Sequence, residues 1–494
     1  MYLLVSDLDA GIPLPTNRYF SRREARLHLQ GRGRGVEVRP IKYTKNYFMK
    51  LSFVWPSGRQ ACYFLLCMSL TIVSASGCRR SADGPGASIP ADLLSSNVID
   101  KWFTLQIRLY KNATGISNGA FARPFAYSGI CAYESIDPVG SWKSKYNGLS
   151  GLPSPARNKT YYWPLAVNAS LAEFNRSFFT AANSNATDIA AIDSLESAII
   201  SSIGLLPAGV ADRSGKFGRS IADAIYDWSQ TDEYNENNLL PYTLPVGEGL
   251  WILTPPAFGK PIGPFWKDDR PIITGSGNHA QPGPPIPYSA NPKSDFYQMV
   301  NDLYKASKVL TTDQKNWALF WRDVPGLTTP GHWMSIIQQV IKQTHGSLDK
   351  AALTYALVGI CINDANISVM KTKYTYNLLR PVSYIRSVIG DTAWLSAIPT
   401  PAHPEYSSAH SVVSGAAAEA LTVLYGDIGP FTDHSYDYLG FPARTFKNFR
   451  DIGVDAGNSR FYGGIHYQPS IDAGLIQGKT VGLNVLNKLT GSSH

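Results

Sequence analysis

Three things are scarce in this chain of 494 residues: cysteine, net charge outside the N-terminal region, and alternation of apolar with polar residues. Of the five cysteines only Cys131 and Cys361 follow residue 80, so a disulfide scaffold is excluded and two separate buried thiols are favoured over a pair. Residues 1–80 hold 13 of the 45 Lys and Arg and 4 of the 37 Asp and Glu, so residues 81–494 hold 32 and 33. Because the bulk of the chain is close to neutral, nucleic acid is not expected as a partner.

The lack of apolar–polar alternation argues against a β-sheet fold. Apolar residues recur instead at helical spacing, for example Ile189, Ile192, Leu195, Ile199 and Ile203. After residue 78, no apolar run is long enough and free enough of charge to cross a membrane. Residues 251–294 are rich in Pro and Gly and predict a long irregular loop. The fold class is therefore predicted to be all-α, with a helical-bundle core.

The N-terminal region has the pattern of an export signal. A short basic stretch starts at Met49, and an uncharged apolar run from Ala61 to Ser76 follows it. The run is short for a membrane span and suits the apolar part of a signal peptide. The small residues directly before Cys78 resemble a bacterial lipobox, although Ala75 is a less usual first residue than Leu. Export and lipid attachment at Cys78 to a bacterial membrane are expected, with an uncleaved anchor as the alternative.

These patterns divide the chain into five parts. Residues 1–48 form a doubtful N-terminal extension, and residues 49–77 form a signal peptide of lipoprotein type. Residues 78–95 are small and polar and contain Gly and Pro, which is typical of a flexible tether. Residues 96–345 are expected to form a helical N-terminal part that includes the long loop. Residues 346–490 are expected to form a helical catalytic core, which carries the motifs described next.

The first motif pairs Lys373 with Arg380, seven residues further along. Both are expected on one face of a helix over 349–379, which Pro381 would end. Two cations on one face repel each other unless an anion lies between them. Taken alone, such a pair is equally typical of a solvated basic face.

The second motif places His410 directly after Ser408 and Ala409, at the expected start of another helix. Free backbone N–H groups at a helix start favour an anion. Ser408 is expected to cap the helix or donate to that anion, and His410 to act as general acid or base. An ordinary serine cap followed by a surface histidine is the plain alternative.

The third motif is Arg460, directly after a helix expected over about 443–459, followed by His466. Gly463 and Gly464 lie between them and let the chain turn sharply, so that both side chains can face one point. By itself this motif is also typical of a helix end followed by a glycine turn. The occurrence of all three motifs in this order makes the plain alternatives improbable.

Together the motifs resemble the signature of the superfamily that joins vanadium-dependent haloperoxidases with type 2 acid phosphatases. The resemblance extends over about residues 95–485, and segments 320–333 and 363–386 are similar to the haloperoxidase version. The gap between Arg380 and His410 is also similar to that of haloperoxidases, since soluble phosphatases usually have a shorter one. The resemblance implies an all-α fold with a helical-bundle catalytic core, vanadate as cofactor, and hydrogen peroxide and halide as partners.

The resemblance also implies roles for single residues. Those expected to hold vanadate are Lys373, Arg380, Ser408, Ala409, Arg460 and His466. His466 would bond the vanadium, or attack phosphorus if the chain is a phosphatase. His410 would face the apical oxygen and manage the protonation of peroxide. Asp323 would correspond to a carboxylate that steadies the site arginine and this histidine, unless it is an ordinary helix-end residue.

Three positions depart from the family's pattern. Ala409 replaces a glycine, so its N–H is kept but a positive φ would cost energy. Met370 stands where many relatives have Trp near the site. In the phosphatase signature an Asp follows the last histidine by four residues. Here that position is Ser470, and Asp472 either orients His466 or starts a helix.

His403 lies seven residues before His410. Algal bromoperoxidases resemble this arrangement, whereas the fungal chloroperoxidase type has Phe there. The resemblance therefore favours bromide or iodide over chloride, with a loop histidine of no halide role as the alternative.

The function predicted from the sequence is a vanadate-dependent peroxidase that oxidises bromide or iodide with hydrogen peroxide to hypohalous acid. One alternative is a secreted acid phosphatase with His466 as nucleophile. Another is a lipoprotein that binds an oxyanion without turnover. Membrane contact is expected only through lipid on Cys78, the organic acceptor is not identified, and a homo-oligomer is left open.

The export pattern gives a first testable prediction. Cys78 becomes the lipidated first residue of the mature protein, and residues 1–77 are absent from it, because a signal peptidase cleaves directly before the cysteine. Mass spectrometry of the membrane-associated protein should find the lipid on Cys78. Peptides from residues 1–48 in that protein would contradict the prediction.

Overall fold

Helices dominate the residues that the computed structural model describes, which are 87–138, 140–323 and 327–491. The expected signal peptide and Cys78 lie outside these residues. The α-helices are α2 (Asn97–Asn112), α3 (Ala122–Glu134), α4 (Trp163–Phe178), α5 (Ala186–Ser202), α6 (Val210–Ser229), α7 (Tyr234–Leu239), α8 (Asp295–Lys308), α9 (Thr312–Phe320), α10 (Thr329–Gln343), α11 (Leu348–Tyr376), α12 (Pro381–Tyr384), α13 (Ala409–Tyr425), α14 (Phe449–Tyr462) and α15 (Gln468–Thr490). The predicted all-α fold is confirmed.

Short elements complete the fold. The 3-10 turns are η1 (Ala91–Leu93), η2 (Asn118–Phe121), η3 (Trp266–Asp268) and η5 (Asp437–Leu439), and η4 (Ile385–Ile389) is a π-helix. Two three-residue strands, β1 (Phe431–Asp433) and β2 (Arg444–Phe446), pair antiparallel with Phe431 opposite Phe446. Residues 251–294 form the predicted irregular loop, interrupted only by η3.

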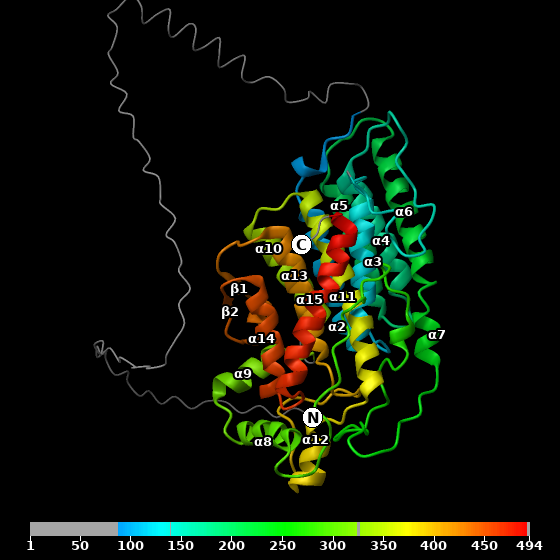
Figure 1. Ribbon diagram of the computed structural model, residues 1–494. Coiled ribbons are helices and arrows are strands. Elements are labelled where there is room, and N and C mark those ends of the chain that lie inside the picture. Colours follow the sequence, from blue (N-terminus) through cyan, green and yellow to red (C-terminus); the bar gives the residue numbers. More distant parts are fainter. Residues whose placement is uncertain (1–86, 139, 324–326, 492–494) are drawn as a thin grey trace, which may run out of the picture. The chain divides into compact units, whose positions relative to one another are not determined.

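Helix α11 is the central element of the fold, packed against α3 on one side and α13 and α15 on another (Figure 1). The prediction that no segment after residue 78 is long and apolar enough to cross a membrane is wrong for α11, the one described helix that has both properties. Its apolar stretch is 89% buried in the protein, as in a core helix. Cys361 of α11 and Cys131 of α3 are both buried and free, which confirms the prediction of two separate thiols.

Glycines let the helices of the C-terminal bundle approach closely. A Cβ atom added at Gly415 of α13 would lie 2.7 Å from the carbonyl oxygen of Leu475 in α15. One added at Gly478 of α15 would overlap the carbonyl of Val412 in α13. The start of α13 is thereby held against α15, close to the segment that carries His466.

Two predicted helices have different bounds. The helix expected over 349–379 ends at Tyr376, because Asn377 adopts a left-handed conformation with φ 46°. Arg380 lies beyond that end, at the N-cap of α12. The prediction that Lys373 and Arg380 share one helix face is therefore wrong. The helix expected from about 443 begins at Phe449, because β2 occupies the residues before it.

The close packing of α13 on α15 can be tested with Gly478→Ala. We expect a loss of about 1–3 kcal/mol in the free energy of unfolding, the usual cost of overpacking a core. Chemical denaturation measures it, with Gly204→Ala as control, since a Cβ there meets nothing within 4 Å. Equal stability of the two variants would show that the helices separate without cost.

Candidate active site

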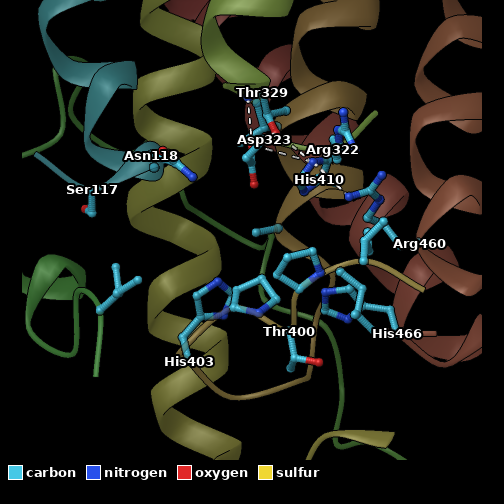
Figure 2. A pocket seen from close by; sticks show the side chains of 18 of the residues that line it. Ser117, Asn118, Arg322, Asp323, Thr329, Thr400, His403, His410, Arg460 and His466 are labelled. Atoms are coloured by element: carbon cyan, nitrogen blue, oxygen red, sulfur yellow. Dashed lines mark hydrogen bonds and ion pairs between the residues drawn. The ribbon is translucent and has the colours of Figure 1, made fainter. Parts of the chain in front are cut away.

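A cavity of about 320 Å³ brings together most of the residues predicted from the sequence. Its lining includes Asp323, His403, Ala409, His410, Arg460 and His466. Figure 2 shows the side chains of His403, His410, Arg460 and His466 turned toward a common space. Lys373, Arg380 and Ser408 do not line the cavity. Arg380 contacts His403 and His466, which do, and Ser408 directly precedes Ala409. Lys373 contacts the carbonyls of Pro404 and Glu405, and Glu405 contacts His466.

His466 is held with one ring nitrogen free of a proton. It follows Gly464, whose φ of 74° turns the chain after α14, and it precedes α15. Its Nδ1 donates to Oε1 of Glu405 at 2.8 Å, so the proton is on Nδ1 and Nε2 carries a lone pair. Burial, with the charges of Arg380 and Lys373, lowers the pKa of His466 well below its usual value. The contact with Glu405 is therefore a hydrogen bond of a neutral imidazole.

Glu405 is the carboxyl group that orients His466. It is fully buried and accepts hydrogen bonds from the backbone N–H of Tyr467 at 3.0 Å and from the hydroxyl of Ser470. Burial raises the pKa of Glu405 to about 7, against the opposing effect of these donors and of Lys373. Asp472 does not orient His466; it accepts instead from the side chain of Gln468 at the surface.

Three cations of the site are buried without a carboxylate partner. Lys373, Arg380 and Arg460 are each at most 1% exposed. Among the described residues, none of them makes an ion pair with an Asp or Glu. Burial lowers the pKa of Lys373 well below its usual value, and those of Arg380 and Arg460 to about 10.

Backbone carbonyls take the place of carboxylates around these cations. The Lys373 ammonium donates to the carbonyls of Pro404 and Glu405 at 2.9 and 3.0 Å. Arg380 donates to the carbonyls of His403 and Ile465, both at 2.9 Å. Carbonyl dipoles do not neutralise a charge, so an anion in the cavity would be attracted.

Arg380 also joins two of the histidines. One of its nitrogens lies 3.2 Å from Nε2 of His466, and another lies 3.0 Å from Nδ1 of His403. Nδ1 of His403 also lies 3.2 Å from the carbonyl of Pro404. Its shorter contact is with Arg380, which only donates, so Nδ1 accepts and the proton is on Nε2. His403 is thus a buried wall of the cavity, tied to a site cation.

His410 is held by acceptors on its Nε2. This atom lies 2.9 Å from the carbonyl of Trp321 and 2.8 Å from the hydroxyl of Thr329. A nitrogen of Arg460, which only donates, lies further from Nε2, at 3.3 Å. The two shorter contacts are satisfied when the proton is on Nε2 and Nδ1 carries the lone pair. Burial and the charge of Arg460 lower the pKa of His410 to about 4, while Asp323 opposes this.

Thr329 connects Asp323 with His410. Its hydroxyl donates to Oδ1 of Asp323 at 3.0 Å and accepts from His410, and the carboxylate itself lies 3.8 Å from the imidazole. A proton gained by His410 would therefore be stabilised by the charge of Asp323, partly through this hydroxyl.

The start of α13 fits its predicted role as an anion-favouring helix end. Ser408 is the N-cap and accepts from the backbone N–H of Ser411 at 3.4 Å. Ala409, the first residue of α13, is not among the residues with positive φ, so the cost expected for replacing glycine does not arise.

Sequence reasoning missed Glu405 and Thr329. A signal for Glu405 was present, because it is the only Asp, Glu, Lys or Arg between Asp391 and Glu419. Thr329 has no such signal, since it is 81 residues from His410.

Comparisons with known proteins agree on one family. The family model for the second helical-bundle domain of VCPO matches residues 353–492. A solved structure of a bacterial vanadium-dependent iodoperoxidase has 30% sequence identity and a TM-score of 0.72, covering 80% of this chain and 96% of that chain. The chain belongs to the vanadium-dependent haloperoxidase family.

More distant haloperoxidases share the fold. The apo and holo structures of a bacterial vanadium-dependent chloroperoxidase have 13% and 14% identity and TM-scores of 0.53 and 0.54. They cover 76% and 84% of this chain, and 95% and 96% of their own chains. No curated protein sequence matches the chain significantly.

The effect of Asp323 on the pKa of His410 can be tested in this haloperoxidase without measuring its activity. Asp323→Asn removes a negative charge that raises the pKa of His410, so this pKa should fall below its starting value of about 4. NMR of histidine-labelled protein measures it against pH. Asp472→Asn is the matched control and should leave this pKa unchanged. A higher pKa in Asp323→Asn would contradict the link.

Proposed function

We propose that this chain is a vanadate-dependent peroxidase that oxidises bromide or iodide with hydrogen peroxide to hypohalous acid. The observation that carries the proposal is the set of three buried cations that form no ion pair with a carboxylate, beside a neutral imidazole whose Nε2 carries no proton and contacts one of them, Arg380. An oxyanion would compensate the cations, and a neutral imidazole oriented by a carboxylate is a common metal ligand. The donor set therefore fits vanadate.

The proposal assigns the contacts to vanadate as follows. Lys373, Arg380 and Arg460 would face its oxygens, with hydrogen bonds from Ser408 and the N–H of Ala409. His466 would supply the bond to vanadium through Nε2. When bound, vanadate supplies a Lewis acid that activates peroxide for attack by halide without a change of oxidation state.

His410 is proposed to manage the proton of hydrogen peroxide. With a pKa of about 4 it is neutral over most of the pH range, so Nδ1 is ready to accept a proton. The positive charge of Arg460 helps to lower the pKa of His410. An anion near Arg460 would offset that charge and so raise the pKa of His410. The charge of Asp323 would then stabilise the protonated form of His410. His410 could return this proton to the peroxide oxygen that leaves.

The preference for bromide or iodide is supported by two observations. His403 lies on the cavity wall and contacts Arg380. The 30% identical relative is described as an iodoperoxidase. We also propose export and lipid attachment at Cys78, which rest on the sequence pattern alone.

The two histidines are predicted to behave differently when replaced. His466→Ala should lose specific vanadate binding and peroxidase activity, because it removes the bond to the metal. His410→Ala should keep weakened vanadate binding, because the cations remain, but lose about 10²–10⁴-fold in halide oxidation. Calorimetry with vanadate and an assay of bromide oxidation measure the two effects. His434→Ala, at an exposed histidine, is the control.

Equal vanadate affinity in His466→Ala and the parent protein would show that the wrong histidine has been assigned. Hydrolysis of a phosphate monoester without vanadate, together with no halide oxidation when vanadate is added, would favour the phosphatase alternative.

A further inference from the structure

Met370 lies on the wall of the cavity, close to the proposed chemistry. It belongs to α11 and lines the cavity together with His403, His410 and His466. Only 2% of the residue is exposed, and it packs against Trp266 and other apolar side chains. The cavity lining contains no cysteine, tryptophan or tyrosine. Met370 is therefore its most easily oxidised side chain.

We propose that Met370 is a self-modification site, oxidised to the sulfoxide by hypohalous acid formed in this cavity. The inference rests on the proposed function, which supplies the oxidant. The sulfur lone pair attacks the electrophilic halogen, and water delivers the oxygen: thioether plus hypohalous acid gives sulfoxide, halide and a proton. Sulfur loses two electrons and the halogen gains them.

This balance makes the halide a catalyst of the modification. Halide consumed in forming hypohalous acid is released again when Met370 is oxidised, so the net reaction is thioether plus hydrogen peroxide to sulfoxide plus water. An amount of halide below that of the protein should therefore be enough. Hydrogen peroxide without halide should act much more slowly.

Two other described methionines serve as internal comparisons. Met299 of α8 is only partly buried, and Met334 of α10 is completely buried. Neither lines the cavity. An oxidant added to the solution should reach Met299 first, since it is the most exposed of the three. An oxidant formed in the cavity should reach Met370 first.

Oxidation at Met370 should also affect turnover. A sulfoxide places a polar oxygen in an apolar cluster that includes Trp266 and Tyr374, so the cavity wall must repack. The activity of the parent protein should decline during bromide oxidation faster, relative to its own initial rate, than that of Met370→Leu. Leucine has a similar volume and no oxidisable sulfur. Met299→Leu should decline like the parent.

The direct test uses the full chain with vanadate, hydrogen peroxide and bromide, and counts sulfoxides by mass spectrometry. The three methionines fall in separate tryptic peptides, 294–305, 323–342 and 351–371. We expect sulfoxide at Met370 ahead of Met299 during turnover, the opposite order with hypobromous acid added to the solution, and much slower formation at Met370 without bromide. Bromide oxidation is followed in the same samples with a dye. Free methionine in the solution should not protect Met370.

Each result has a defined meaning. Bromide oxidation that leaves Met370 intact, oxidises Met299 first, or is made harmless to Met370 by free methionine overturns the inference and leaves the proposed function standing. If neither bromide nor iodide is oxidised, the inference and the proposed function are both overturned. Sulfoxide at Met370 in His466→Ala at the rate of the parent protein would also refute the inference, because its oxidant would not come from the site.

Discussion

Burial of three cations that no carboxylate pairs directly is the constraint on which the rest of the site depends. Three cations are almost completely removed from water, and removal of a charge from water costs several kcal/mol even after relaxation. The cost falls when carbonyl oxygens approach, as those of Pro404 and Ile465 do. It falls further only when an anion arrives. The cavity beside these cations is thus suited to bind one.

The helices contribute to the same balance through their ends. Lys373 lies in the last turn of α11 and Arg460 in the last turn of α14, where the helix dipole favours a cation. His410 lies in the first turn of α13, where the dipole favours an anion in front of the backbone N–H groups. The negative C-terminal ends of α11 and α14 therefore lie at the cations, and the positive N-terminal end of α13 lies at the cavity.

The sequence was enough to find the residues whose signal is local. Five of these residues lie in short motifs. The structure places His410, Arg460 and His466 in the cavity lining, Arg380 against His466, and Lys373 against the carbonyl of Glu405. The shared helix face of Lys373 and Arg380 was wrong because it depended on Asn377, whose left-handed conformation ends the helix early.

The partners that orient the histidines could not be read in the same way. The hydrogen bond from His466 to Glu405 spans 61 residues, and that from His410 to Thr329 spans 81. Such contacts depend on how helices pack, which no local pattern records. The role of the glycines at the α13–α15 contact could not be predicted from the sequence either, because it depends on the backbone of the opposite helix.

The carbonyl-lined cations have a second consequence, which concerns metals other than vanadium. Neutral imidazoles, such as the three around this cavity, are individually ligands for divalent transition metals such as zinc or copper. Among the described residues, no three His, Cys, Asp or Glu side chains are grouped closely enough to hold such an ion. Beside three buried positive charges, a free divalent cation is repelled, whereas a metal already wrapped in oxygens as an anion is attracted. The net charge of an incoming metal complex therefore decides whether it is attracted to the site before any bond to a histidine forms. The buried cations thereby disfavour the binding of common divalent metal ions to these histidines.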